Sequence, residues 1–176
     1  MTTGVRGVGV DIVDLGAFAA SLAEPGTRLT RAFSATERRQ CRERAESRGA
    51  RPGEATVSSS SGASGASAPG TSGPAPARRE DPLARHLAAR WAAKEAVVKA
   101  WSAALYGEPP PIAPDLLRWS EIETVCDNWG RPSVRLGGEV ARQVAATIGE
   151  GARWNVSLSH DGGSAIAFVV LEGPGG

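Results

Sequence analysis

Residues 82–105 read PLARHLAARWAAKEAVVKAWSAAL, and this stretch decides the fold. Asp81 is suited to an N-cap and Pro82 to the first helical position, while Gly107 and the prolines at positions 109–111 end the pattern. Most of the interior residues are strong helix formers. The sequence therefore predicts one long helix here.

The segments before this helix predict a strand and two shorter helices. Residues 5–13 read VRGVGVDIV, which places the branched side chains at positions 8, 10 and 12 on one strand face. The other face carries glycines at positions 7 and 9 and one carboxylate, Asp11. A short helix is expected from Asp14 to about residue 23. The residues Ser34-Ala-Thr-Glu37 match a capping box that opens a second helix toward residue 44.

The segments after the long helix predict an antiparallel arrangement. Residues 121–126 and 132–136 flank a turn, Asp127-Asn-Trp-Gly130, which indicates a hairpin. Residues 138–148 are expected to form a helix, and the runs 154–160 and 165–171 two strands joined by a glycine turn. This order predicts an α+β fold, with a largely antiparallel sheet on which the helices pack.

Length and composition favour one globular domain over residues 1–176. The hydrophobic fraction is 41% and the net charge +1, with scattered basic residues, so neither nucleic acid nor a membrane is expected as a partner. Residues 47–79 are rich in serine, glycine and proline and predict a flexible insertion. A partner-binding loop is the alternative for this segment.

The cysteines and the N-terminus favour a cytoplasmic setting. Cys41 and Cys126 have no metal-ligand spacing, and the first residues lack the apolar core of a signal peptide. We expect both cysteines to pack as small apolar residues. The most apolar early stretch, residues 8–23, contains Asp11 and Asp14 and is therefore no membrane span.

Asp11 and Glu95 are the candidate metal ligands. Magnesium is usually held by one or two carboxylates together with substrate phosphates. Asp11 shares its strand face with glycines, and Glu95 lies among alanines in mid-helix. The alternatives are that Asp11 belongs to the cap of the next helix, and that Glu95 pairs with Lys99 on a solvated surface.

The two lysines of the chain, Lys94 and Lys99, flank Glu95, whereas every other basic residue is arginine. This distribution suggests positions where a compact ammonium is needed. A metal carboxylate flanked by cations suits a pyrophosphate substrate; the alternative is a helix with one charged, solvent-facing side, which is common. His160 ends the polar strand face of residues 155–159, where it could bind a phosphate, act as a base, or only satisfy the backbone.

The ordered motifs resemble those of holo-[acyl-carrier-protein] synthases, the AcpS-type 4′-phosphopantetheinyl transferases, and look most like actinobacterial members. The matching motifs are GVDIV at 9–13, RAFSATE at 31–37, LAARWAAKEAVVKA at 87–100, GRP at 130–132 and VSLSH at 156–160. The resemblance runs from about Val5 to Glu172 and excludes the serine-rich insertion.

The resemblance implies roles for particular residues. Asp11 and Glu95 would ligate Mg²⁺, and Lys99 would contact the transferring phosphate. Coenzyme A phosphates would be contacted by Arg90, Lys94 and His160, and the turn carrying Arg131 would lie near the adenine. We also expect Glu95 to remove the proton of the attacking serine, either directly or through a metal-bound water.

The resemblance further implies the 4′-phosphopantetheinyl transferase fold, a reaction and partners. The expected reaction moves phosphopantetheine from coenzyme A to a serine of acyl carrier protein, releases 3′,5′-ADP, and supports fatty acid biosynthesis. A homotrimer with active sites between subunits is expected, so that His160 would come from a different chain than Asp11.

One departure and two alternatives accompany the resemblance. Many relatives carry an arginine on the first helix that meets the carrier, where this chain has Ala17; Arg28, Arg31, Arg38 or Arg39 would have to substitute. The enzyme would alternatively serve a polyketide or peptide synthase, or the chain would be a non-catalytic coenzyme A-binding module.

Overall fold

The computed structural model describes residues 3–49 and 81–174. Its elements are β1 (Thr3–Asp14), α1 (Leu15–Ala23), η1 (Leu29–Ala32), α2 (Ala35–Gly49), α3 (Pro82–Ala104), η2 (Trp119–Glu121), β2 (Ile122–Cys126), β3 (Pro132–Leu136), α4 (Gly138–Thr147), β4 (Arg153–Asp161) and β5 (Ser164–Pro174). The predicted order of strands and helices is confirmed, and the expected α+β class with antiparallel pairing is correct. The helix α2 runs five residues beyond residue 44, through Gly49, and most of the predicted insertion lies outside the described residues.

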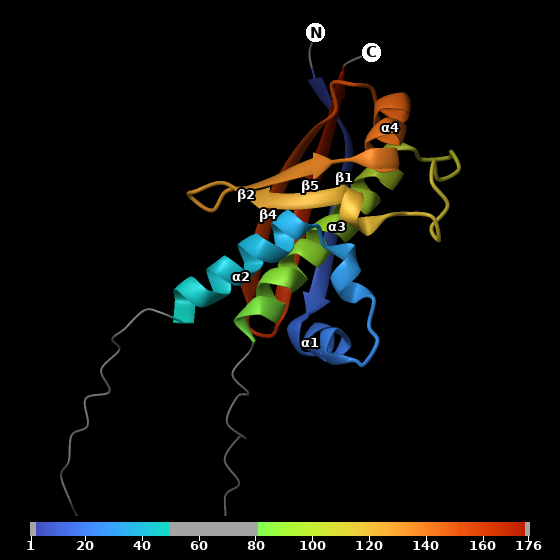
Figure 1. Ribbon diagram of the computed structural model, residues 1–176. Helices are drawn as coiled ribbons and strands as arrows, with labels where there is room; N and C mark the ends of the chain where they lie inside the picture. Colours follow the sequence, from blue (N-terminus) through green and yellow to red (C-terminus); the bar gives the residue numbers. More distant parts are fainter. Residues whose placement is uncertain (1–2, 50–80, 175–176) are drawn as a thin grey trace, which may run out of the picture.

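Two antiparallel sheets organise the chain. The larger has the strand order β1-β5-β4, and β2 pairs with β3 in a separate hairpin. Because Thr3 lies opposite Pro174, the two ends of the described chain lie side by side (Figure 1). The long helix α3 crosses one face of the larger sheet, and the hairpin packs beside it with α2 (Figure 1).

The glycines of β1 allow α3 to sit directly on the sheet. A Cβ atom on Gly9 would lie 2.0 Å from the carbonyl oxygen of Ala96, and one on Gly7 would lie equally close to that of Ala100. The facing residues of α3 are fully buried alanines, which bring the helix backbone near the strand. Consequently the residue that follows these glycines on the same strand face, Asp11, also points at α3.

The capping box predicted at residues 34–37 is present, and its glutamate has a second role. The backbone N–H of Ser34 donates to Glu37 Oε2 (2.9 Å), and the N–H of Glu37 donates to Ser34 Oγ (3.1 Å). The same carboxylate accepts from the N–H of Thr124 at 2.9 Å and from Lys94 Nζ at 2.8 Å. Glu37 therefore joins α2, α3 and β2 at one fully buried point.

The two thiols differ in environment and should differ in reactivity. Cys41 is fully buried, and this burial raises the pKa of its thiol to about 11. At about pH 8 roughly one thiol in a thousand would then be ionised, so we expect Cys41 to resist alkylation. Cys126 is half-buried. A thiol-specific reagent should titrate one equivalent in the native protein and two after denaturation; rapid native titration of both would contradict this prediction.

No helix in the described part of the chain is long and apolar enough to cross a membrane.

Candidate active site

Packing of α3 on β1 brings together three of the predicted residues. Lys99 Nζ lies 2.8 Å from Asp11 Oδ1 and 3.2 Å from the carbonyl oxygen of Val10. Glu95 is one turn before Lys99 on α3, and it lines with Asp11 a shallow cavity of about 390 Å³. The remaining wall comes from the end of β1, from α1 and from Trp91. The site thus has the carboxylates of Asp11 and Glu95 in one cavity, with the Lys99 ammonium beside Asp11.

The two carboxylates influence each other electrostatically. Partial burial raises the pKa of Glu95, the negative charge of Asp11 raises it further, and Lys99 opposes these two effects. The pKa of Lys99 is raised mainly by its hydrogen bond to Asp11. A cavity in which one carboxylate destabilises the charge of another is suited to a cation.

The alternative interpretations of these residues do not agree with the contacts. Asp14, rather than Asp11, caps α1, because Asp14 Oδ1 accepts from the N–H of Ala17 at 2.7 Å. Lys99 forms its ion pair with Asp11 on another element, and it acts on Glu95 only through its charge. Asp11 therefore does not cap α1, and Glu95 does not form the ion pair along the helix that the sequence allowed.

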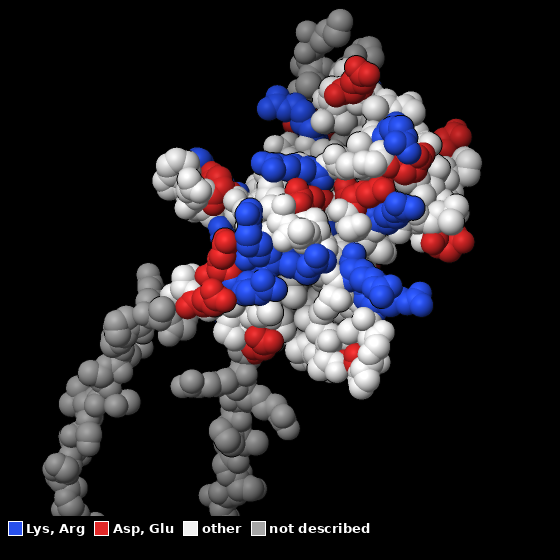
Figure 2. All heavy atoms as spheres, in the orientation of Figure 1, with Lys and Arg blue, Asp and Glu red and all other residues white. Residues whose placement is uncertain are grey.

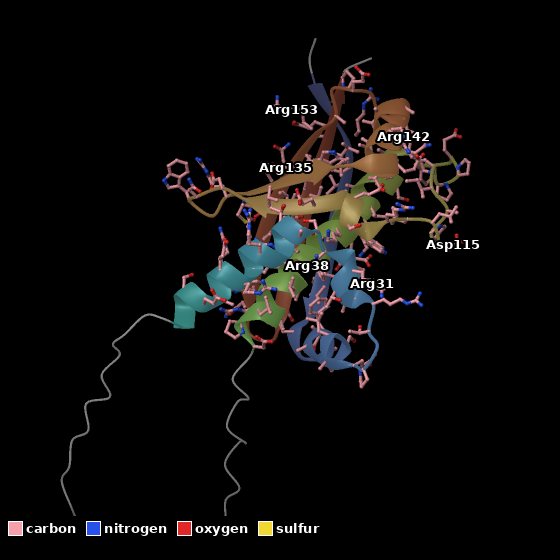
Figure 3. The ribbon with its side chains drawn as sticks, viewed as in Figure 1. Arg31, Arg38, Asp115, Arg135, Arg142 and Arg153 are labelled. Atoms are coloured by element: carbon pink, nitrogen blue, oxygen red, sulfur yellow. The ribbon has the colours of Figure 1, made fainter. Side chains whose placement is uncertain are left out.

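A second cavity, of about 360 Å³, lies between α2 and the β2–β3 hairpin. Arg39, Arg131 and Arg135 line it together with Cys126, whose Sγ accepts from Arg90 Nη2 at 3.2 Å. Arg131 also pairs with Asp127 at 2.6 Å and stacks 5.0 Å from the ring centre of Trp129. Basic side chains gather on this face of the molecule over α2 (Figure 2), and Arg38 and Arg135 are labelled on it in Figure 3. Such a cavity is suited to an anion.

Sequence comparison decides the family. The profile of the 4′-phosphopantetheinyl transferase superfamily matches residues 66–169. The chain belongs to this superfamily.

Relatives within the 4′-phosphopantetheinyl transferase superfamily narrow the assignment. A holo-[acyl-carrier-protein] synthase of Corynebacterium glutamicum is 39% identical over 164 residues, covering 93% of this chain and 96% of the relative. One of Bifidobacterium animalis is 41% identical over 173 residues, covering 94% and 97%. The predicted resemblance to actinobacterial holo-[acyl-carrier-protein] synthases is confirmed, and the chain is an enzyme of this type.

Solved structures of acyl carrier protein synthases support the same assignment. The structure described as "Chronobacterium ammoniagenes ACPS-CoA complex" is 36% identical, with a TM-score of 0.72 and coverage of 96% of this chain and 97% of that one. The acyl carrier protein synthase of Mycobacterium tuberculosis is 32% identical, with a TM-score of 0.61 and coverage of 97% and 100%. The predicted phosphopantetheinyl transferase fold is confirmed.

The position of Lys94 does not agree with the phosphate contact that the resemblance implied. The Lys94 side chain is fully buried, and its ammonium donates to Glu37 Oε2 and to the carbonyl oxygens of Trp119 and Ile122. An ammonium has three N–H donors, so none is left for a phosphate. Burial lowers the pKa of Lys94, and Glu37 opposes this shift. In this structure Lys94 is a structural residue.

His160 lies apart from Asp11 and Glu95. His160 is on β4 and pairs with Ala165 of β5, and β5 lies between β4 and β1 in the larger sheet. Its half-buried side chain belongs to the face of Val156 and Leu158, because side chains alternate along a strand. The prediction that it ends the polar face of residues 155–159 is wrong in this respect.

The sequence interpretation did not identify two features of the site. It did not assign Glu37 to a buried pair with Lys94, although the capping box at residues 34–37 placed this glutamate at a helix start. It also did not place Arg39 and Arg135 with Arg131. The hairpin and α2 meet through tertiary packing, which cannot be predicted from a local sequence pattern.

Proposed function

We propose that the chain transfers the 4′-phosphopantetheine group of coenzyme A to a serine of apo-acyl carrier protein, releases 3′,5′-ADP, and serves fatty acid biosynthesis in the cytoplasm. The observation that carries this proposal is the cavity shared by Asp11 and Glu95, with Lys99 at 2.8 Å from Asp11. The names of the similar enzymes, and the coenzyme A complex among the similar structures, support it.

The carboxylate pair fits Mg²⁺. Among the described residues, 3–49 and 81–174, no group of three or more His, Cys, Asp or Glu side chains is placed to hold a metal. Two carboxylates, with the rest of the coordination left to water and substrate phosphates, are the usual protein share of a magnesium site. Bound there, Mg²⁺ would neutralise negative charge on the pyrophosphate.

The residues of the chain have separate tasks in the proposed reaction. The serine hydroxyl of the carrier attacks the β-phosphorus of coenzyme A, a new P–O bond forms, and the bond to 3′,5′-ADP breaks. Glu95 accepts the serine proton, for which a carboxylate with a raised pKa is a stronger base. Lys99 donates to the transferring phosphate and stabilises the charge that develops on it.

The arginine-lined cavity is proposed to bind the adenosine end of coenzyme A. Cys126 accepts from the buried Arg90 and lines this cavity with Arg131, and Arg39 and Arg135 add positive charge. Arg90 and Glu95 are five residues apart on α3 and therefore project about 140° from each other. One coenzyme molecule contacting both groups is more easily held between two subunits than within one.

The outer face of the larger sheet supports the proposed homotrimer. Val10 and Ile12 of β1 are 46% and 65% exposed, and their partners on β5, Phe168 and Ile166, are 46% and 36% exposed. Contiguous apolar patches of this kind mark interfaces in soluble proteins. His160 faces the other side of this sheet, with Val156 and Leu158, so its contact with coenzyme A in a neighbouring subunit stays a prediction.

Phe168→Asp should dissociate this assembly, because it places a charge in the middle of the apolar face. Light scattering of the wild type is expected to give about three times the chain mass of 18.1 kDa, and that of the variant the single-chain mass. Leu116→Asp is the matched control, since Leu116 is 69% exposed and lies outside the sheet. A trimeric Phe168→Asp protein would exclude this face as the interface.

The carrier is proposed to dock through Arg31. Arg38 Nη1 donates to the carbonyl of Phe33 at 2.7 Å, and Arg39 lines the cavity proposed for the adenosine end of coenzyme A. Arg31 is exposed on η1, next to α1, and projects outward (Figure 3). Ala17 lines the cavity of Asp11, so an approaching carrier would pass this helix.

The direct test is incubation with coenzyme A, Mg²⁺ and a purified apo-acyl carrier protein. Mass spectrometry should show a gain of one phosphopantetheine on the carrier serine, dependent on Mg²⁺. Bound coenzyme A without any transfer would favour the non-catalytic binding module, and faster transfer to a polyketide or peptide carrier domain would favour the other alternative.

A further inference from the structure

A buried guanidinium lies against one of the two thiols of the chain. Arg90 is only 3% exposed. Among residues 3–49 and 81–174 it forms no ion pair and its Nε has no hydrogen-bond partner, whereas its Nη2 donates to Cys126 Sγ at 3.2 Å. A buried cation without a counter-charge destabilises a protein, so an anion formed at this position would stabilise the folded chain.

The unpartnered Nε and the occupied Nη2 belong to one edge of the planar guanidinium. This edge presents two N–H groups in parallel, and the fork that they form matches two oxygens of a single anion. A thiol sulfur is a weak acceptor and fills one of the two positions. Oxygen atoms bonded to Cys126 Sγ would bring strong acceptors to both N–H groups of Arg90.

The sulfur of Cys126 is held in place and is open to small solutes. Gln40 Nε2 donates to the carbonyl oxygen of Cys126, and the N–H of Cys126 donates to Gln40 Oε1, both at 3.0 Å. Cys126 is half-buried and lines the cavity between α2 and the β2–β3 hairpin. Asp127 also lines this cavity, but its carboxylate is paired with Arg131 at 2.6 Å. The cavity therefore leads to a sulfur whose partner is the cation of Arg90.

We propose that Cys126 is a site of oxidation by peroxides, and that Arg90 binds the sulfur oxyanion that forms. The sulfur attacks one oxygen of hydrogen peroxide, an S–O bond forms as the O–O bond breaks, and the leaving hydroxide takes the thiol proton as water. A second peroxide converts this sulfenic acid to the sulfinic acid with release of another water, and the sulfinic acid ionises. Nη2 and Nε of Arg90 then donate to the two sulfinate oxygens.

Oxidation of Cys126 should weaken the binding of coenzyme A. This effect rests on the proposed function, in which the adenosine end of coenzyme A occupies the same cavity. A sulfinate adds a negative charge to the cavity and neutralises Arg90, so it opposes the binding of the coenzyme phosphates. Cys41 does not share this chemistry, because it is fully buried and burial raises the pKa of its thiol to about 11.

Treatment of the native protein with hydrogen peroxide, followed by peptide mass spectrometry, tests the site. The peptide that contains Cys126 should gain about 32 Da, for two oxygens, while the Cys41 peptide stays unchanged. The transfer rate of the wild type should fall with this gain, whereas that of Cys126→Ser should be the same before and after treatment. Equal oxidation of both thiols, or a Cys41–Cys126 disulfide in place of the sulfinate, would overturn the proposal.

A matched pair of variants tests the role of Arg90 without an oxidant. Cys126→Asp places a carboxylate beside the guanidinium, and Cys126→Asn places a neutral group of the same shape there. The Tm of Cys126→Asp should be higher by at least about 3 °C, because Arg90 gains a counter-charge, and its Kd for coenzyme A should be at least about tenfold higher. An equal or lower Tm would overturn the assignment of an anion to Arg90. A higher Tm with an equal Kd would support the oxidation site and overturn the placement of the adenosine end in this cavity.

Discussion

Glu95→Gln should abolish phosphopantetheine transfer and leave the fold intact. The amide keeps the shape of the side chain but can neither accept the serine proton nor contribute a negative charge to a cation shared with Asp11. We expect the transfer rate to fall by about 10³-fold or more, as when a group that stabilises the transition state is removed. The rate is measured as the appearance of holo-carrier by mass spectrometry.

Stability provides the second measurement for this variant. The pKa of Glu95 is raised because burial and the charge of Asp11 disfavour its ionised form, so a neutral side chain relieves both costs. The Tm of Glu95→Gln should therefore equal or exceed that of the wild type. Glu46→Gln is the matched control, because it makes the same change at an exposed position of α2. Turnover of Glu95→Gln at the wild-type rate would refute the assignment of Glu95 to the metal and to catalysis.

Lys94→Met should destabilise the protein strongly. It leaves the fully buried Glu37 carboxylate without its cation, and it removes the donor to the carbonyls of Trp119 and Ile122. Breaking a buried ion pair from one side costs about 3–5 kcal/mol. Denaturant unfolding should show this as a lower free energy of unfolding.

Lys99→Met is the matched control, since it removes the other lysine of the chain. The Lys99 side chain is 52% exposed, and exposed ion pairs contribute about 0–1 kcal/mol. We therefore expect opposite profiles: Lys99→Met should lose transfer and keep its stability, whereas Lys94→Met should lose stability. Equal stability of the two variants would contradict the buried role of Lys94. A Glu37→Gln/Lys94→Met double variant should lose less than the sum of its single variants, because the residues are in contact.

Much of the fold was predictable because it depends on contacts near in the sequence. The Ser34–Glu37 capping box and the proline at the start of α3 act over three or four residues, and the structure confirms both. The alternation of β1 also placed Asp11 on the glycine face correctly, because side-chain direction along a strand has a period of two. These features can be predicted without knowing which residues pack against them.

The roles of the two lysines required the tertiary structure. The sequence by itself determined that Lys94 and Lys99 flank Glu95 and project about 140° apart, because an α-helix turns about 100° per residue. It did not determine how α3 is rotated against the sheet. That rotation is set by the glycines of β1, by the alanines that face them, and by Glu37 on α2, all distant in sequence. Only the packed structure therefore decided that Lys94 points into the core, while Lys99 lies beside Asp11 and Glu95 at the cavity.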